Sequence, residues 1–382
     1  MKKWVVVLFI CCLTSNFSQT NISPQFSELK GMEDQLGNTH LFYRIYTYSQ
    51  SPISHWSNHI YHWDLNQDVN TFFIDDSGFE TLFDEYNKWV NDVDYWNNNP
   101  AEFIYCGGEH FGPLMSGSAY IRRYDGYLNF FGFYGSSVNY LDISLINDSL
   151  LYSGFYTDPN IIFEEELAIL KSSNGGRSWD TVSVTYQFLS LCPTNENIYF
   201  VENESRELLR TTNSGNTFEL VDSEQLPGSR FFYDANGTRI YRVIGSKLKI
   251  SNSNGAQNTW QLAYSSNSDI HISVYDNSPG AAWLATGKNL FLTTDGGSSF
   301  QLMKSFESDI VGVHTNSDDP FVYAATKYRI YEIDLLEDSL KIIKSITPPS
   351  ENYAWFPLEV GNLWAYENYY TENGIPYFAG YS

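Results

Sequence analysis

The chain has 382 residues, of which 45 are acidic and 22 are basic, so its formal net charge at pH 7 is −23. This excess of acid excludes the basic face that nucleic acids and anionic membrane surfaces require. Aromatic residues make up 17% of the chain, and because such side chains suit pleated strands, the composition favours a β-rich protein.

The first residues have the pattern of an export signal. Met1-Lys-Lys-Trp is followed by an apolar run from Val5 to Leu13 and then by polar residues. A basic start, a short apolar segment and a polar exit are typical of a signal peptide, and the run is too short to span a membrane. We therefore expect residues 1–19 to be a signal peptide and the mature protein to be secreted or held at the surface of a bacterium. A lipoprotein signal at Cys11 is the alternative.

After this segment only two cysteines remain, Cys106 and Cys192. Two cysteines do not make a disulfide framework in a domain of this size. Both lie in apolar, strand-like runs, which favours buried thiols, although the pattern leaves a bridge between them open.

Residues 20–347 show short strands separated by turns. Two early units are each indicated by three strands, the first at 40–47, 59–63 and 71–74 and the second at 103–106, 119–123 and 128–133. Between them, apolar residues from Phe79 to Val93 recur at helical spacing, and Ser77 to Glu80 resembles a capping box. We predict an amphipathic helix over residues 78–93.

A four-fold repeat occupies the second half of the chain. Its copies are Ser172-Ser-Asn-Gly-Gly-Arg-Ser-Trp179, Thr211-Thr-Asn-Ser-Gly-Asn-Thr-Phe218, Ser251-Asn-Ser-Asn-Gly255 with Thr259-Trp260, and Thr293-Thr-Asp-Gly-Gly-Ser-Ser-Phe300. Their starts at 172, 211, 251 and 293 lie 39, 40 and 42 residues apart. A period of about 40 residues in a β-rich chain predicts the blades of a β-propeller. Four strands per period give seven blades over residues 20–347, and six blades with the first segment as a cap is the alternative.

The composition changes after residue 347. Pro348-Pro-Ser-Glu is a linker signal, and an aromatic segment follows from Trp355 to Tyr366. Residues 348–382 are therefore expected to be a linker and the start of a further β module, or a segment that closes the ring.

The repeated motif resembles the Asp-box, or bacterial neuraminidase repeat, whose pattern is Ser-x-Asp-x-Gly-x-Thr-Trp. Its acidic, glycine and aromatic positions are matched by Asn174, Gly176 and Trp179, by Asn213, Gly215 and Phe218, by Gly255 and Trp260, and by Asp295, Gly297 and Phe300. In a hairpin turn, Asn or Asp binds backbone amides, Gly takes a positive φ and the aromatic ring anchors the hairpin, so we expect these residues to be structural. Families with this box include sialidases, xyloglucan-degrading hydrolases, the sortilin ectodomain and a photosystem assembly propeller. The resemblance therefore implies a propeller without selecting an activity.

A sialidase-like site is indicated only weakly. Tyr43-Arg44-Ile45-Tyr46 resembles the family motif whose arginine binds the substrate carboxylate, but the proline of that motif is missing. The other arginines and the Tyr–Glu nucleophile pair of that family have no recognisable counterpart. Arg44 is therefore interpreted as a strand residue.

Asp-Ile pairs recur where inner strands are expected to begin, at Asp142, Asp269 and Asp309. Because inner strands surround the axis of a propeller, these carboxylates could meet at one mouth of the channel and bind a cation or a polar ligand. Glu165, in a long acidic connection, would lie over the same face. The alternative is that each aspartate caps its own strand and that the acidic run is solvated.

A second candidate site follows the first unit. Asp64, Asn66 and Asp68 place oxygens at alternate positions, as in the first half of a calcium loop. Val69 stands where that loop needs glycine, so a polar hairpin turn is the alternative.

The sequence shows no complete catalytic set. It predicts a secreted, non-catalytic propeller that binds or scaffolds a glycan or protein ligand, with calcium as the only candidate cofactor. The rival prediction is a glycoside hydrolase, sialidase-like or glucan-cleaving, that uses carboxylates on one face of the ring.

Overall fold

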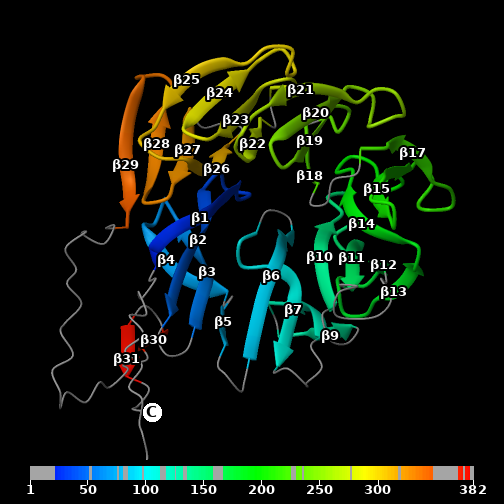
Figure 1. The fold of residues 1–382 in the computed structure, drawn as a ribbon, viewed down its shortest axis with the longest axis horizontal. Helices are drawn as coiled ribbons and strands as arrows, with labels where there is room; N and C mark the ends of the chain where they lie inside the picture. The colour runs from blue at the N-terminus through cyan, green and yellow to red at the C-terminus, as the bar shows by residue number, and fades with distance from the viewer. Residues whose placement is uncertain are drawn as a thin grey trace, which may run out of the picture.

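A computed structural model describes most of the chain between residues 22 and 346, together with two short strands near its end. The described ranges are 22–50, 54–74, 77–80, 85–96, 99–111, 118–124, 126–131, 136–157, 167–224, 229–234, 236–275, 278–316, 320–346, 369–372 and 375–378. The predicted signal peptide and Glu165 lie outside these residues. The sheets are arranged around a common centre (Figure 1).

Four separate sheets, each with four antiparallel strands in chain order, make up residues 136–305 of the described structure. One contains β10 (Ser136–Ile143), β11 (Leu151–Thr157), β12 (Leu167–Ser172) and β13 (Asp180–Ser183). The next contains β14 (Tyr186–Leu191), β15 (Tyr199–Asn203), β16 (Leu208–Thr211) and β17 (Glu219–Asp222). The third contains β18 (Arg230–Tyr233), β19 (Ile240–Ile244), β20 (Lys247–Ser251) and β21 (Gln261–Ser265). The fourth contains β22 (Ile270–Val274), β23 (Ala282–Thr286), β24 (Asn289–Thr293) and β25 (Gln301–Ser305).

The other main-body strands belong to a thirteen-stranded sheet that joins the two ends of the ring. It includes β26 (Ile310–Thr315), β27 (Phe321–Thr326), β28 (Arg329–Asp334) and β29 (Ser339–Ser345). It continues through β1 (Ile22–Glu33), β2 (Thr39–Gln50), β3 (Ser54–Asp64) and β4 (Val69–Ile74). It ends with β5 (Ser77–Glu80), β6 (Glu85–Tyr95), β7 (Phe103–Phe111), β8 (Ser118–Arg123) and β9 (Leu128–Phe131). β26 meets β1 in a parallel bridge at Leu29 and Gly312, which brings the two ends of the ring together.

The predicted helix over residues 78–93 is wrong, because β5 and β6 occupy its described residues. No α-helix occurs anywhere in the described ranges. The β6–β7 register skips Asn91, since Val90 pairs with Gly107 and Asp92 pairs with Cys106. Phe79 of β5 pairs with Tyr86 of β6, so the apolar spacing that indicated a helix spans two antiparallel strands. The bulge at Asn91 further breaks the two-residue alternation of β6.

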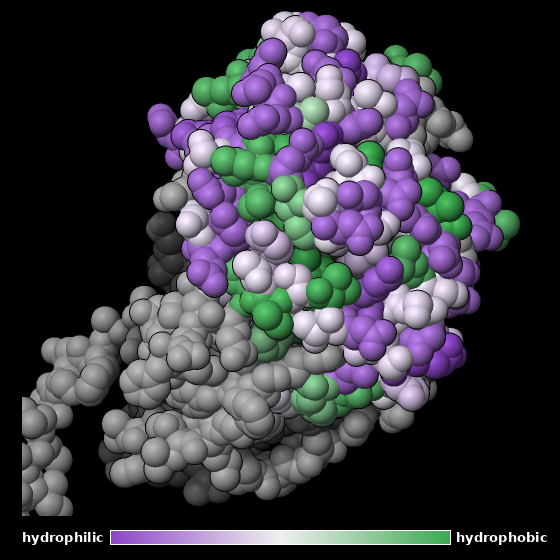
Figure 2. Space-filling view, turned by 90° about the vertical axis from the view of Figure 1, so that its right-hand side faces the viewer, coloured by the Kyte–Doolittle hydropathy of each residue, from purple (hydrophilic) through white to green (hydrophobic). Residues whose placement is uncertain are grey.

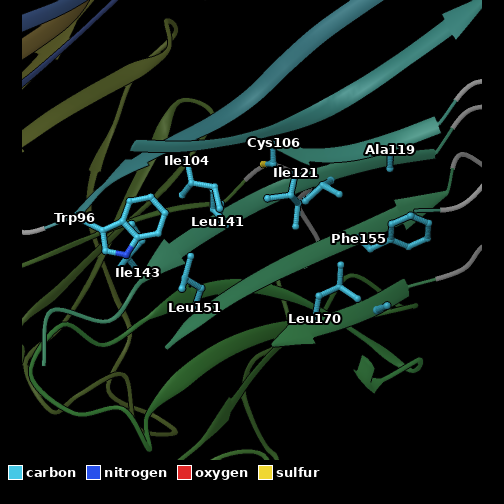
Figure 3. Close-up of a cluster of buried hydrophobic side chains, with 12 residues drawn as sticks. Trp96, Ile104, Cys106, Ala119, Ile121, Leu141, Ile143, Leu151, Phe155 and Leu170 are labelled. Carbon is cyan, nitrogen blue, oxygen red and sulfur yellow. The ribbon is translucent and has the colours of Figure 1, made fainter. Parts of the chain in front are cut away.

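Apolar side chains fill the spaces between neighbouring sheets. In one cluster Ile104, Cys106 and Ile121 of the β6–β9 run pack with Leu141 and Leu151 of the next sheet (Figure 3). Other clusters join successive sheets in the same way. The core of the molecule is therefore divided among the seams between sheets.

The four repeated motifs form hairpin turns with nearly the same hydrogen bonds. Gly297 N donates to Thr293 Oγ1 (2.9 Å), and Ser299 N donates to Asp295 Oδ1 (2.9 Å). The same bonds link Gly176 to Ser172 and Ser178 to Asn174, and link Gly215 to Thr211 and Thr217 to Asn213. The copy at Ser251 keeps the glycine bond (3.1 Å), and Ser251 Oγ lies 2.6 Å from Thr259 Oγ1.

Two strands, β30 (Tyr369–Glu372) and β31 (Ile375–Phe378), form a separate antiparallel pair. Cys106 and Cys192 are free and buried. Among the described residues there is no helix with the length and apolar character of a membrane span. The side of the ring that faces the viewer in Figure 2 shows apolar patches separated by polar side chains.

Candidate functional site: the central cavity

The innermost strands of the ring enclose a cavity of about 850 Å³. Its wall is built from β1, β6, β10, β14, β18, β22 and β26 and from residues beside them. The wall includes both charged and neutral polar groups, namely Glu28, Lys30, Asn91, Asp92, Asn139, Asp142, Ser190, Arg230, His271, Ser273, His314 and Asn316.

One side of the cavity carries an ion-paired group on β1, β2 and β6. Glu28 Oε2 lies 2.5 Å from Arg44 Nε, and Lys30 Nζ lies 3.5 Å from Glu28 and 3.7 Å from Asp92. Burial raises the pKa of Glu28, but Lys30 and Arg44 outweigh it and hold the pKa at about 2. Arg44 is thus a strand residue with an internal carboxylate partner.

Carboxyl groups on the adjoining wall accept hydrogen bonds from the next strand. Asp92 Oδ2 accepts from Leu141 N (3.1 Å), and Asp142 Oδ2 accepts from Leu191 N (2.6 Å). Burial raises the pKa of both, and in Asp142, where Asp94 and Asp92 add to the effect, it reaches about 8. Asp142 is therefore mostly protonated at neutral pH.

Strands β18, β22 and β26 add cationic and imidazole groups to the cavity wall. Arg230 donates to Ile270 O on the neighbouring strand (3.1 Å). Burial lowers the pKa of His271 and of His314 to about 4, and Arg230 adds to the effect on His271. His314 Nε2 lies 2.6 Å from Asn316 Oδ1. Both imidazoles are therefore neutral at pH 7.

The three predicted Asp-Ile aspartates do not come together. Asp142 is the second-last residue of β10, whereas Asp269 and Asp309 immediately precede β22 and β26. Asp142 lines the cavity, and the other two are exposed residues outside its lining. The alignment of these pairs as equivalent strand starts was wrong because β10 begins at Ser136, earlier than its apolar pattern indicates.

Asp64, Asn66 and Asp68 lie in the hairpin turn between β3 and β4. Asp64 Oδ1 accepts from Asn66 N (2.9 Å) and Gln67 N (3.0 Å), and Asp68 Oδ1 accepts from Trp63 Nε1 (3.2 Å). Asn66 Oδ1 accepts from Thr39 N (3.1 Å). These bonds use oxygens that a cation would need. Calcium at this turn stays a prediction, which melting curves with calcium and with EDTA check.

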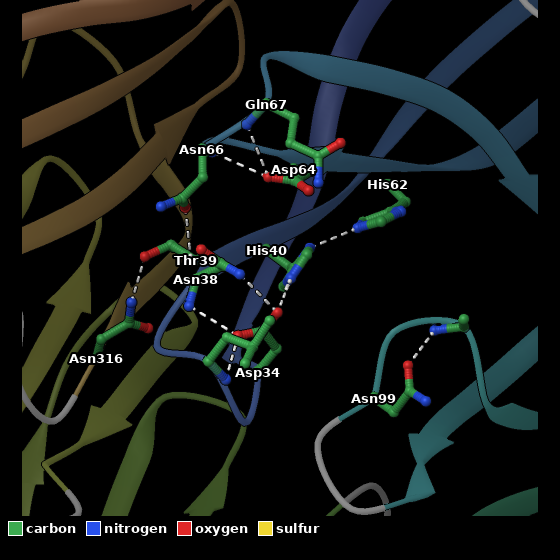
Figure 4. Close-up of polar contacts among 12 residues, drawn as sticks. Asp34, Asn38, Thr39, His40, His62, Asp64, Asn66, Gln67, Asn99 and Asn316 are labelled. Carbon is green, nitrogen blue, oxygen red and sulfur yellow. Dashed lines mark hydrogen bonds and ion pairs between the residues drawn. The ribbon is translucent and has the colours of Figure 1, made fainter.

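A second pocket of about 480 Å³ lies beside this turn. There His40 Nδ1 lies 3.0 Å from His62 Nε2, and His40 Nε2 lies 3.3 Å from Asp34 Oδ2 (Figure 4). Burial and the neighbouring His40 lower the pKa of His62 to about 4. Within the described part of the chain, no three His, Cys, Asp or Glu side chains gather in a way that could hold a metal ion.

Sequence reasoning missed Glu28, Lys30, Asp92 and Arg230. The first three lie on β1 and β6, which were not recognised as strands. Asp92-Val-Asp94 and Glu28-Leu-Lys30 do alternate polar and apolar residues, and this period of two was the signal that could have found them.

No family model matches the chain, and a search of curated proteins also gives no match. Among solved structures, a GH74 enzyme of Niastella koreensis is similar with a TM-score of 0.53 and 11% identity, over 83% of this chain and 53% of that chain. YCF48 from Cyanidioschyzon merolae gives 0.45 and 14%, over 67% of this chain and 84% of that one. A chain of a nidogen/laminin complex gives 0.40 and 10%, over 64% and 93%. This chain spans about half the length of the GH74 enzyme.

At such identities the likeness concerns the fold alone. Antiparallel four-stranded sheets set around a central cavity, together with the similarity to the GH74 structure, define a β-propeller. The protein is accordingly an all-β propeller.

Proposed function

We propose that the chain is a secreted, non-catalytic β-propeller of seven four-stranded blades with degenerate Asp-boxes, which binds or scaffolds a glycan or protein ligand. The blade count is supported by the four separate sheets and by three further runs of four strands, β1–β4, β6–β9 and β26–β29, within the described part of the large sheet. The Asp-box assignment is supported by the shared hydrogen bonds of the four turns.

One observation carries the non-catalytic proposal. Three of the four acidic residues that line the cavity are engaged by other residues of the protein, since Glu28 is paired with Arg44 and Lys30, while Asp92 and Asp142 accept hydrogen bonds from backbone amides. Groups used in this way hold neighbouring strands together. Asn91 also bonds within the protein, since its Nδ2 donates to Ser137 Oγ (2.5 Å), Val138 O (2.9 Å) and Asn139 Oδ1 (3.0 Å). The neutral imidazole of His271, which lines the same cavity, suits the hydrogen bonds that a polar ligand offers.

The test is a binding and turnover screen of residues 20–382. The protein is offered to immobilised glycans and to a native cell-surface extract, and soluble polysaccharides and sialosides are assayed for cleavage, each with and without calcium. Retention on a glycan or capture of a surface protein without turnover is expected. His271→Ala should weaken retention, and Asn252→Ala, outside the cavity, should not. Turnover, or failure to retain any ligand, contradicts the proposal.

A glycoside hydrolase is the second candidate, and the cavity carboxyls favour it in one respect. Glu28 is ionised with a pKa of about 2, while Asp142 has a pKa of about 8, and both line the same cavity. A pair of carboxyls whose pKa values are pushed apart is what acid and nucleophile or base roles need. If turnover is found, Asp142→Asn and Glu28→Gln should each abolish it, and the exposed Asp309→Asn should leave it unchanged.

A further inference from the structure

Two neighbouring seams of the propeller are joined by carboxyl groups. Asp92 Oδ2 and Asp94 Oδ2 of β6 accept from Leu141 N (3.1 Å) and Ile143 N (2.5 Å) of β10. Asp142 Oδ2 of β10 accepts from Leu191 N of β14 (2.6 Å). These bonds connect inner strands that have no backbone ladder with each other in the described structure.

Other seams use groups that do not titrate in the same range. Between β22 and β26, Ser273 Oγ accepts from Thr315 N (3.0 Å). Between β18 and β22, the bond runs from the Arg230 guanidinium to Ile270 O. The ring therefore contains comparable seams between inner strands. Some of them are bridged by a carboxyl group and others by a hydroxyl or a guanidinium group.

The three carboxyls face mainly one another and one cation. From β1 the charged neighbours are Lys30, 3.7 Å from Asp92, and Glu28. From β6, β7 and β18 the titratable neighbours are Tyr95, Cys106 and Tyr233, which burial keeps neutral. From β14 the uncharged Ser190 side chain contacts Asp142. Lys30 is shared with Glu28, so one ammonium group cannot neutralise three ionised aspartates.

We propose that the β6–β10 and β10–β14 seams form a pH-responsive joint, which is closed in acid and loosens in mildly alkaline solution while the β22–β26 seam stays shut. The physical cause is the cost of placing three negative charges in a poorly hydrated seam. Opening the seam hydrates the carboxylates and separates them, so ionisation favours the open state. The opening lies beside the cavity wall, and it therefore changes access to the cavity.

The direction of the pKa shifts agrees with this geometry. Burial raises the pKa of Asp94 to about 7 and that of Asp142 to about 8, from an ordinary value of 3.8. A group whose pKa is raised in the closed state favours that state fully below its ordinary pKa, and this contribution is lost as the pH rises through the raised value. The joint should therefore be tightest below about pH 4 and should loosen progressively as the pH rises to about 8.

Amide hydrogen exchange of the full chain tests the joint. Peptides that cover β10 and β14 report on the carboxyl seams, and a peptide that covers Thr315 reports on the serine seam. Exchange at pH 5, 7 and 9 is corrected for the intrinsic rate at each pH. Protection at β10 and β14 should fall by at least about tenfold from pH 5 to pH 9, since one pKa unit corresponds to a tenfold change, and protection at Thr315 should stay constant.

Two isosteric variants separate this mechanism from general alkaline loosening. Asp142→Asn should flatten the pH profile at β14, and Asp94→Asn should flatten it at β10, while the exposed Asp309→Asn should keep the wild-type profile. If one variant does not fold, the other variant and the wild-type pH profile still test whether the carboxyls cause the loss of protection. Equal protection at pH 5 and 9 in the carboxyl seams, an equal loss in all seams, or unchanged profiles in both variants would overturn the proposal.

Discussion

At the scale of single residues, the first Ser or Thr of each repeated turn is as important as the Asx and Gly that define the motif. Ser172, Thr211, Ser251 and Thr293 are each about 1% exposed or less, and each accepts the amide of the motif glycine. Sequence reasoning assigned roles to the Asx, Gly and aromatic positions and none to this hydroxyl. The hydroxyl satisfies an amide that the turn buries, which local propensity alone does not reveal.

Replacing this hydroxyl should therefore destabilise the protein. Thr293→Val keeps the shape but leaves the Gly297 amide without its acceptor, and we expect a loss of about 1–3 kcal/mol in the free energy of unfolding. Thr293→Ser, which keeps the hydroxyl, should lose less than half as much. Urea unfolding of the three proteins checks this, and equal losses in both variants would contradict the hydrogen-bond argument.

The motif glycines are constrained by the neighbouring sheet as well as by their own turn. Gly255 has φ +69°, and a Cβ there would lie 2.4 Å from Phe200 Cζ of the preceding sheet. Gly126 has φ +88° with nothing within 4 Å of such a Cβ. Both alanine substitutions should cost about 1–2 kcal/mol for the left-handed backbone. Gly255→Ala should lose about 1–3 kcal/mol more through overpacking. Chemical denaturation measures the difference in the free energy of unfolding. Equal losses in the two variants would show that Phe200 moves aside without cost.

At the scale of elements, arginines from one sheet hold the turn of the next. Arg123 donates to Gly175 O, and Arg210 Nη1 donates to Asn254 O (2.6 Å) while its Nε donates to Glu219 Oε1 (2.8 Å). Arg239 Nε bonds Asn252 Oδ1 (2.6 Å) within its own sheet, and its guanidinium lies against Gly296 of the next. Three of the four turns are thus tied both to their own hairpin and to the sheet before it.

Removing one such contact should weaken one seam. Arg210 is 9% exposed, so Arg210→Gln leaves both Glu219 and Asn254 O without their partner, and we expect a loss of about 2–3 kcal/mol. The exposed Arg177→Gln serves as the control and should change stability by less than about 0.5 kcal/mol. Thermal and urea unfolding check both, and no loss for Arg210→Gln would show that water replaces the bond.

At the scale of the whole molecule, the ring is closed by an approach of two backbones. A Cβ at Gly312 would lie 2.5 Å from Leu29 N and 2.6 Å from Leu29 O, and Phe26 N donates to Lys327 O (2.7 Å) across the same seam. Gly312 does not have a positive φ. A larger residue is therefore excluded at this position by the lack of space and not by the backbone conformation. The two ends of the described ring are thus joined by contacts between residues that lie some 280 positions apart in the chain.

Gly312→Ala should therefore weaken ring closure specifically. Backbone atoms cannot move aside as a flexible side chain can, so we expect a loss of about 3 kcal/mol or more in the free energy of unfolding. Exchange protection should fall first in β1 and β26. Gly126→Ala, measured in parallel, should leave the protection of these strands unchanged. Unaltered protection at β1 and β26 in Gly312→Ala would contradict this account of closure.

Much of the fold can be predicted from patterns among residues that are close in the sequence. The 40-residue period, the Asx-Gly turns and the alternation within strands predicted an all-β propeller and the positions of most strands after residue 136. The inner strands β1 and β6 were missed, since a bulge at Asn91 disguised one and the other precedes the repeated region. The cavity carboxyls Glu28 and Asp92 were missed with them, because a residue can be assigned to the axis only once its strand is placed.

The repeat and the turn chemistry follow from residues close together in the chain, and the acidic character follows from composition, so these features can be predicted without the fold. The tertiary structure alone decided which strand of each sheet faces the axis, where the ring closes and which carboxyls share a seam. These features depend on contacts between residues separated by one or more repeats, and the free energy of such contacts is set by burial and distance in the folded ring. Asp142 shows this most clearly, since only its place between Asp94 and Leu191 distinguishes it from Asp269 and Asp309.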